Sequence, residues 1–126
     1  SFVETKESTY LRLDKKVAPF HCAIFPLVKK PAMTKLSKKL LKLLREYGFE
    51  AFYDEAASVG RRYARADEIG VPFCITIDDD SLKKKTLTIR DRDSTKQVRI
   101  KIEKLNIALI DLFYHNKKLK DIGKLI

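Results

Sequence analysis

The sequence predicts a single α/β domain built on a mixed five-stranded β-sheet that is flanked by three helices. Apolar runs of strand length alternate with segments of helical period in the first half of the chain, and such crossovers require parallel or mixed strands. The later strand-like segments follow one another at hairpin spacing. With 126 residues, 44% of them hydrophobic, the chain is long enough and apolar enough to build one core.

Each element is predicted from its own pattern. Residues 34–47 carry leucines at helical spacing, with Thr34 available as the N-cap and Gly48 as the C-terminal stop. Near the end of the chain, strand-like alternation gives way to helical spacing, so the expected order is β-α-β-α-β-β-β-α. The strands are expected at 20–28, 49–53, 71–78, 86–91 and 97–102, the helices at 34–47, 59–69 and 103–115, and a polar hairpin or loop at 79–85.

The chain divides into three parts by composition. Residues 1–18 are polar and irregular, which is typical of a linker or an N-terminal extension. Residues 19–115 hold all the predicted elements and form the domain. Residues 116–126 match no pattern and are expected to be a C-terminal tail.

Charge and cysteine content narrow the class of protein. Lys plus Arg number 27 against 17 Asp plus Glu, and the formal net charge of +10 favours a polyanionic partner, most often nucleic acid. The longest apolar runs are too short to span a membrane, and the first residues lack a secretory signal pattern. Cys22 and Cys74 lie in separate apolar, strand-like runs, so we expect reduced core thiols in a cytoplasmic protein rather than a disulfide or zinc site.

Residues 58–93 form the most informative stretch of the chain. Three arginines open a predicted helix, a buried strand leads away from it, and two more arginines end the next strand. This order predicts that five guanidinium groups converge on one polyanion. Arginine suits this role because its planar fork donates two parallel hydrogen bonds to a phosphate or a guanine edge. The free backbone N–H groups near Ser58 and Gly60 add a further phosphate-binding feature.

Periodicity assigns faces to these side chains. In a helix over 59–69, Arg61, Arg65 and Glu68 share one face and Arg62 lies on the adjacent flank. On the following strand, Thr88, Arg90 and Arg92 lie opposite Ile89. Unstacked loop bases of RNA are read on their edges and stacked on aromatic or guanidinium planes. The candidate RNA-binding residues are therefore Arg61, Arg62, Arg65, Glu68, Tyr53, Thr88, Arg90 and Arg92, with Tyr53 preferred to Phe52.

Plainer interpretations stay open for several of these residues. The arginines could instead form ion pairs that support the fold, with Asp67, Glu68, Asp91 or Asp93 as partners. The lysines of 34–47 fit a solvated helix face better than an RNA contact. The three aspartates at 78–80 indicate a turn rather than a metal site, and His21 and His115 have no catalytic partner pattern. We therefore expect no catalytic residue, metal or cofactor in this domain.

Several motifs resemble one protein family. They are GRRYAR at 60–65, DEIG at 67–70, TID at 76–78 and TIRDRD at 88–93, with FPL at 25–27, FYD at 52–54 and YLRL at 10–13. In this order they are similar to the C-terminal anticodon-binding domain of archaeal and eukaryotic glycyl-tRNA synthetases. The resemblance covers roughly residues 9–114. The arginine motif and the Arg-Asp-Arg-Asp motif together make it specific.

The resemblance implies a fold and a function. The family's domain has a mixed sheet shared by several class II synthetases, and it grips the anticodon stem-loop of glycine tRNA. A separate catalytic domain uses ATP and Mg²⁺ to activate glycine and attach it to the tRNA, and the enzymes are typically dimers through that part. These 126 residues leave no room for the catalytic domain, so the chain is expected to be inactive alone, either as one domain of a longer enzyme or as a separately encoded subunit.

Two other functions remain as alternatives. The first is a non-catalytic accessory subunit, of the kind that serves polymerases, which would bind duplex DNA with the same fold. The second is a small enzyme of flavodoxin-like topology. The second is the weaker, because it needs a glycine-rich phosphate loop after the first strand and residues 26–33 contain no glycine.

Overall fold

The structure of the protein is a computed structural model that describes residues 20–126. The expected N-terminal extension, 1–18, lies outside the described residues. The strands are β1 (Cys22–Pro26), β2 (Ala51–Tyr53), β3 (Phe73–Ile77), β4 (Thr86–Asp91), β5 (Gln97–Lys101) and β6 (Lys124–Leu125). The helices are α2 (Pro31–Glu46), α3 (Val59–Glu68), α4 (Asp79–Lys84), α5 (Leu105–Tyr114) and α6 (Leu119–Ile122), and the 3-10 turn η2 (Ile102–Lys104) precedes α5.

The strands form one mixed sheet in the order β2-β1-β3-β4-β5-β6. β1 pairs in parallel with both β2 and β3, whereas β3, β4, β5 and β6 pair antiparallel in succession. The α/β class and the mixed sheet predicted from the sequence are thus confirmed. The parallel half arises from the helical crossovers α2 and α3, and the antiparallel half from short connections.

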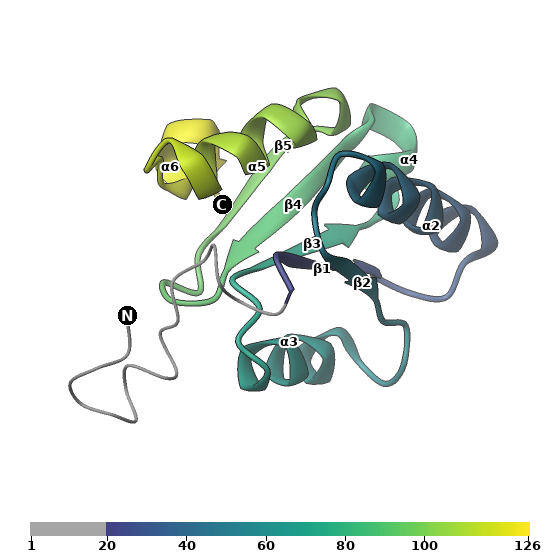
Figure 1. The fold of residues 1–126 in the computed structure, drawn as a ribbon. Helices are drawn as coiled ribbons and strands as arrows, with labels where there is room; N and C mark the ends of the chain where they lie inside the picture. Colours follow the sequence, from purple (N-terminus) through teal and green to yellow (C-terminus); the bar gives the residue numbers. More distant parts are fainter. Residues whose placement is uncertain (1–19) are drawn as a thin grey trace.

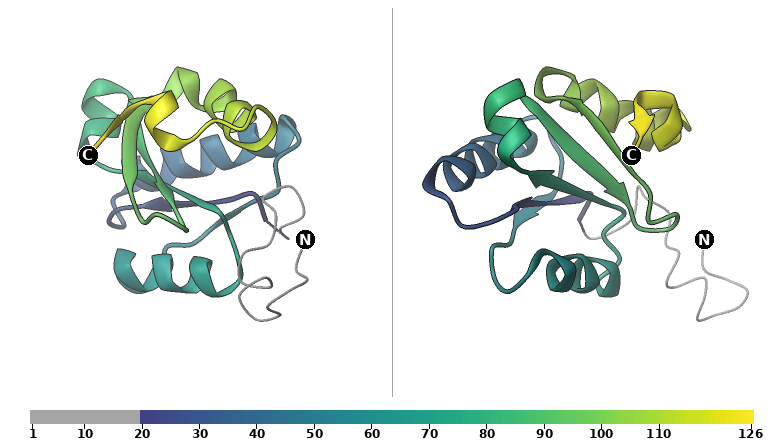
Figure 2. Two further views of the ribbon diagram at one scale, coloured as in Figure 1. Left: turned by 90° about the vertical axis from the view of Figure 1, so that its left-hand side faces the viewer. Right: turned by 180° about the vertical axis from the view of Figure 1, so that it is seen from behind.

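The two faces of the sheet are covered unequally (Figure 1). α2, α4, α5 and α6 lie on one face, over a large core that includes Ile24, Ile75, Ile89 and Leu109. α3 is the only described helix on the other face, where a small cluster joins Phe25 and other β1 and β3 side chains to α3. Figure 2 shows the same arrangement from two further sides. Within residues 20–126, no helix combines the length and apolar character needed to cross a membrane.

Three details differ from the sequence-based expectation. The sheet has six strands instead of five, because Lys124–Leu125 pairs with β5 as β6. Residues 79–85, expected as a polar hairpin or loop, contain the short helix α4. Asp78 and Ser81 form a reciprocal capping box at its N-terminus. α2 begins at Pro31, one turn before the expected N-cap Thr34, because proline is favoured in the first turn of a helix.

Two other predictions hold in detail. Gly48 follows α2 with φ of +96°, the left-handed conformation that a glycine adopts freely, so it ends the helix as expected. Cys22 and Cys74 are free and buried. Burial raises the pKa of each thiol to about 12, which keeps both protonated and unreactive.

The last residues of the chain pack onto the domain. Leu119 in α6 is buried in the large core, and the backbone of Ile126 donates to the carbonyl of Gln97. The segment 116–126, expected as a tail, therefore supplies a helix and a strand to the fold.

Candidate nucleic-acid interface

Strand alternation places a row of polar side chains on the α3 side of β3, β4 and β5. Cys74 and Arg90 are register partners, as are Thr76 and Thr88, and Thr88 in turn is opposite Arg99. Because residues in register lie on the same face, the inward Ile75, Ile89 and Val98 leave their polar neighbours on the opposite face. We call this surface the α3-side face and define it as Thr76, Thr86, Thr88, Arg90, Gln97 and Arg99.

Arg90 occupies the centre of the α3-side face. Its two terminal nitrogens donate to the two carboxylate oxygens of Asp67, at 3.2 and 3.4 Å, and its guanidinium lies 4.6 Å from the ring centre of Tyr63. The Tyr63 hydroxyl lies 3.0 Å from the Thr76 hydroxyl. Only 12% of the Arg90 side chain is exposed. Asp67 and Tyr63 thus fix the guanidinium plane before any ligand arrives, which lowers the entropy lost on binding.

Arg99 lies beside it on β5 and is more accessible, with 27% of its side chain exposed. It donates to both carboxylate oxygens of Asp78 and, at 3.0 Å, to the hydroxyl of Thr86. Burial pushes the pKa of Asp78 upward, but the hydrogen bonds and charge of Arg99, with those from Ser81, outweigh burial and bring the pKa below its usual value. The hydrogen bonds that Arg99 donates to Asp78 raise the pKa of Arg99, so both members of this pair stay charged.

The Asp78 pair makes stability depend on pH. Because its pKa is lower in the folded than in the unfolded protein, the ion pair stabilises the fold above the ordinary aspartate range and loses this effect as pH falls through the folded pKa. Asp78→Asn, which can still cap α4, is expected to lower the free energy of unfolding by about 1–2 kcal/mol at pH 7. Urea titrations across pH 2–7 should show that the difference in free energy of unfolding between the variant and the unchanged protein disappears in acid. Asp79→Asn is the control, because Asp79 is exposed and its one ion-pair partner among residues 20–126 is the exposed Lys30.

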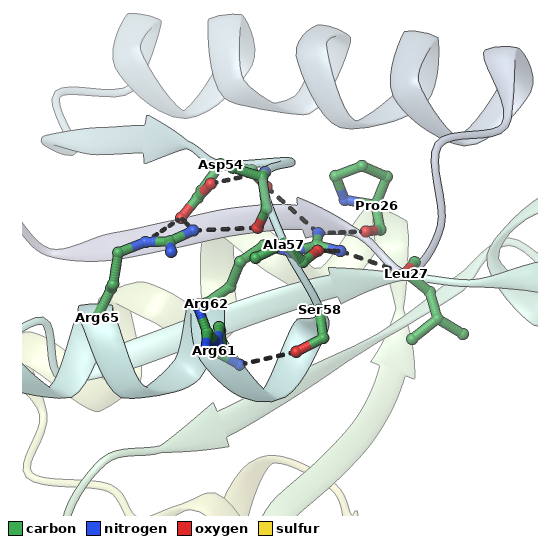
Figure 3. A network of polar contacts seen from close by, with 9 residues as sticks. Pro26, Leu27, Asp54, Ala57, Ser58, Arg61, Arg62 and Arg65 are labelled. Carbon is green, nitrogen blue, oxygen red and sulfur yellow. Dashed lines mark hydrogen bonds and ion pairs between the residues drawn. The ribbon is translucent and has the colours of Figure 1, made fainter.

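The arginines of α3 serve the fold more than an open surface (Figure 3). Ser58 caps the helix by accepting from the backbone N–H of Arg61, as its position suggested. Arg65 donates to the carboxylate of Asp54 at 2.7 and 3.1 Å and to the carbonyl of Ala56, which ties down the β2–α3 loop. Arg62 is 3% exposed. It donates to four backbone carbonyls, those of Pro26, Leu27, Asp54 and Ala57.

The eight predicted site residues therefore do not form one cluster. Thr88 and Arg90 share a face opposite Ile89, as the alternation predicted. Arg61 and Glu68 are exposed on the outer side of α3, and Arg65 turns to the β2 side of that helix. Arg62 lies in the interior, so its expected place on an RNA-facing flank is corrected. The five guanidinium groups lie in different surroundings and do not converge.

Two further residues lie away from the α3-side face. Tyr53 packs against the large core on the α2 side, donates to Glu55 and has Lys38 over its ring, so the tyrosine preferred for its hydroxyl points away from the α3-side face. Phe52 is the one that joins the small cluster. Arg92 follows the end of β4, is 9% exposed and pairs with Asp93. Its burial leaves it little surface for a ligand.

Four members of the α3-side face were not predicted from the sequence: Thr76, Thr86, Gln97 and Arg99; nor were Tyr63 and Asp67, the α3 residues that hold Arg90. A signal for Arg99 was present, because it alternates with the apolar Val98 and Ile100 in the strand that follows Arg90. A hairpin register between the two strands would have put Arg99 beside Thr88. Asp67 was foreseen only as a partner in a fold-supporting ion pair.

The described residues offer no sign of a metal centre: among residues 20–126, no group of three or more His, Cys, Asp or Glu side chains is placed to hold an ion. His21 accepts from the backbone N–H of Glu50 and packs against Phe49 and Phe113. Burial lowers its pKa, which favours the neutral ring in this structural role. The α3-side face can thus bind and orient a polyanion, using arginine forks, hydroxyls and an amide.

Comparisons with known proteins agree with this fold and give its family. The family described as "Anticodon binding domain" matches residues 21–111. The glycine–tRNA ligase of Methanocaldococcus jannaschii is 47% identical over 105 residues, which is 83% of this chain and 18% of that enzyme. The glycine–tRNA ligase of Archaeoglobus fulgidus is 39% identical over 122 residues, 97% of this chain and 21% of that enzyme. The chain thus spans about a fifth of the length of these relatives.

Solved structures show the same fold at low sequence identity. The RNA-binding domain of threonyl-tRNA synthetase from Cryptosporidium parvum superposes with a TM-score of 0.75 at 17% identity, over 84% of this chain and 26% of that one. Prolyl-tRNA synthetase from the same organism superposes with a TM-score of 0.76 at 21% identity, over 82% of this chain and 22% of that one.

The mixed sheet, its arginine-bearing face and the family match together define the class of protein: the chain belongs to the anticodon-binding domain family. Within that family it is homologous to glycine–tRNA ligases, and it corresponds to the anticodon-binding part of such an enzyme. The resemblance to glycyl-tRNA synthetase drawn from the arginine motifs is confirmed.

Proposed function

We propose that this domain binds the anticodon stem-loop of glycine tRNA on its α3-side face and so helps a glycyl-tRNA synthetase select its tRNA. The observation that carries the proposal is the Arg90 guanidinium held over the Tyr63 ring by Asp67, on a face that no described helix other than α3 covers. Loop bases stack on guanidinium planes and accept hydrogen bonds from them; Arg90, whose terminal nitrogens already donate to Asp67, meets a base through the 12% of its side chain that is exposed.

Different residues of the surface have different parts in this proposal. Arg90 and Arg99 supply guanidinium groups whose terminal nitrogens also hold Asp67 and Asp78, Gln97 supplies an amide, and the buried Thr88, 5% exposed, lies at the floor of the face. The exposed Arg61 on α3 meets phosphates at the rim, where contacts hold the RNA in register without reading its sequence. The net charge of +10 draws the polyanion in before these contacts form.

The rest of the enzyme follows from the relatives, each of which carries roughly four-fifths of its length outside the matched region. We propose that a catalytic domain, separate from the described residues, attaches glycine with ATP and Mg²⁺ in the cytoplasm, and that a dimer forms through that domain. The present chain then binds tRNA but is inactive alone. The comparisons do not favour the accessory-subunit alternative, since the named relatives are ligases.

Mapping the bound RNA tests the proposed surface directly. In NMR titrations of the labelled chain with the anticodon hairpin of glycine tRNA, the resonances of Thr88, Arg90, Gln97 and Arg99 should shift first. Side chains on the opposite side of the sheet, such as Lys42 on α2, should not shift. Shifts confined to the α2 side of the sheet would contradict this choice of face.

A further inference from the structure

A second charged surface lies on the α2 side of the sheet, away from the proposed RNA site. It is a hollow of about 730 Å³ between α2, α4 and the end of β5, where α2 and α4 lie side by side (Figure 1). We call it the lysine hollow. Its rim is formed by Lys35 and Lys39 of α2, Lys84 and Lys85 at the end of α4, and Lys101 of β5.

The rim is strongly and uniformly cationic. All five lysines are exposed, and none of them has an ion-pair partner among residues 20–126, whereas the nearby Lys30 pairs with Asp79. Glu103 is the one acidic side chain in the lining. Five like charges around one hollow repel one another and raise the local potential, so an acidic ligand that binds there relieves this repulsion.

The floor of the hollow is apolar. Leu36, Leu82 and Ile102 line it, and each is a partly buried side chain that packs on the large core. A ligand that fills the hollow must therefore bring an apolar group to this floor as well as negative charge to the rim. An RNA backbone brings only the charge, and it favours arginine forks such as those of the α3-side face. A polypeptide segment with acidic and large apolar residues brings both.

The backbone at the rim adds a second observation. Lys85 ends α4 with φ of +57°, in the left-handed region where glycine is the usual residue. The carbonyl of Lys85 accepts from the backbone N–H of Ile102, which joins the rim to the floor. Glycine would adopt this conformation without strain, whereas lysine places an ammonium group at the rim but strains the backbone.

From the charge, the floor and the volume we infer that the lysine hollow docks an acidic polypeptide segment that carries at least one large apolar side chain. Carboxylates of the segment pair with Lys35, Lys39 and Lys84, and the apolar side chain lies against Leu36, Leu82 and Ile102. The volume falls within the usual range of binding pockets. Apart from Lys101, which is the register partner of Thr86 at the end of β5, the lining residues belong to the α2 side of the sheet, so the segment and an RNA hairpin bind at separate places.

Two synthetic peptides test this inference on the 126-residue chain. The first is a fluorescein-labelled peptide of alternating Glu and Leu, and the second has each Leu replaced by Ser. Fluorescence anisotropy should give binding of the Leu peptide about tenfold or more tighter than the Ser peptide, because only the first buries apolar surface on the floor. Equal affinity of the two peptides would overturn the inference in favour of non-specific charge attraction.

Matched charge reversals locate the binding. Lys35→Glu with Lys39→Glu should weaken the Leu peptide about tenfold or more, since two rim charges on α2 change sign. Lys42→Glu with Lys120→Glu makes the same change in net charge on exposed lysines outside the hollow and should have a much smaller effect. Equal weakening by the two pairs would contradict the assignment. If an RNA hairpin lost affinity in the first double variant but not in the second, the occupant of the hollow would be RNA and not a peptide.

Lys85→Gly separates binding from folding. Glycine relieves the left-handed backbone, so the thermal unfolding temperature should stay the same or rise, while the Leu peptide binds more weakly. Unchanged peptide affinity in this stably folded variant would remove Lys85 from the site and argue against the inference.

Discussion

Arg90→Ala is expected to remove most of the domain's preference for the glycine anticodon while leaving the fold intact. A good bidentate contact to a base discriminates by about 1–3 kcal/mol, so the ratio of affinities for the correct and altered hairpins should fall roughly 5- to 150-fold. Affinity for the altered hairpin should change much less. The measurement is hairpin binding by fluorescence anisotropy at fixed salt, with thermal unfolding as the check on the fold.

Two further variants give this result its meaning. Arg90→Lys keeps the charge but loses the planar fork that Asp67 and Tyr63 hold, so selectivity should fall nearly as far as in Arg90→Ala. Lys38→Ala removes a charge on the α2 side and should at most weaken both hairpins equally. A uniform loss of affinity in Arg90→Ala, with the preference preserved, would make Arg90 a phosphate contact instead of a base reader.

The second large effect is expected at Arg62, on stability. Its guanidinium joins the ends of β1 and β2 to α3 through four carbonyl oxygens, and it lies 5.6 Å from the ring centre of Phe25. Arg62→Ala leaves these acceptors without their donor and opens a cavity. The free energy of unfolding should fall by about 3 kcal/mol or more. Urea titration at pH 7 measures it.

The neighbouring residue provides a matched control for Arg62. Arg61 lies in the same helix turn but is exposed, and its side chain has no hydrogen-bond or ion-pair partner within residues 20–126. Arg61→Ala should change the free energy of unfolding by no more than about 0.5 kcal/mol. If Arg62→Ala were as stable as Arg61→Ala but bound the hairpin poorly, Arg62 would belong to the RNA interface, and its assignment to the interior would fail.

The fold was predictable because it rests on periods that short segments display. The buried β1 and β3 are continuous apolar runs, and β4 and β5 alternate, so element types and the mixed sheet followed from the residues. The missed elements have no such period. α4 is six residues long and polar, and β6 has two residues, so their formation depends on contacts that sequence patterns do not report.

The site was predictable only in part, because residue type does not determine which way a side chain points. Thr88 and Arg90 were placed correctly by alternation on β4. Arg62 was misplaced although a signal existed: it falls with Val59 and Ala66 in the stripe of α3 that faces the sheet. An arginine within an apolar stripe indicates a buried partner, and here that partner is a set of backbone carbonyls that no motif encodes.

The most direct test of the central claim is the binding of this chain to the glycine tRNA anticodon hairpin and to the same hairpin with its two anticodon cytosines replaced, over a series of salt concentrations. We expect tighter binding to the native hairpin and a preference that persists at moderate salt, since base contacts depend on salt far less than phosphate contacts do. Equal binding to both hairpins and to duplex DNA, falling steeply with salt, would contradict the central claim.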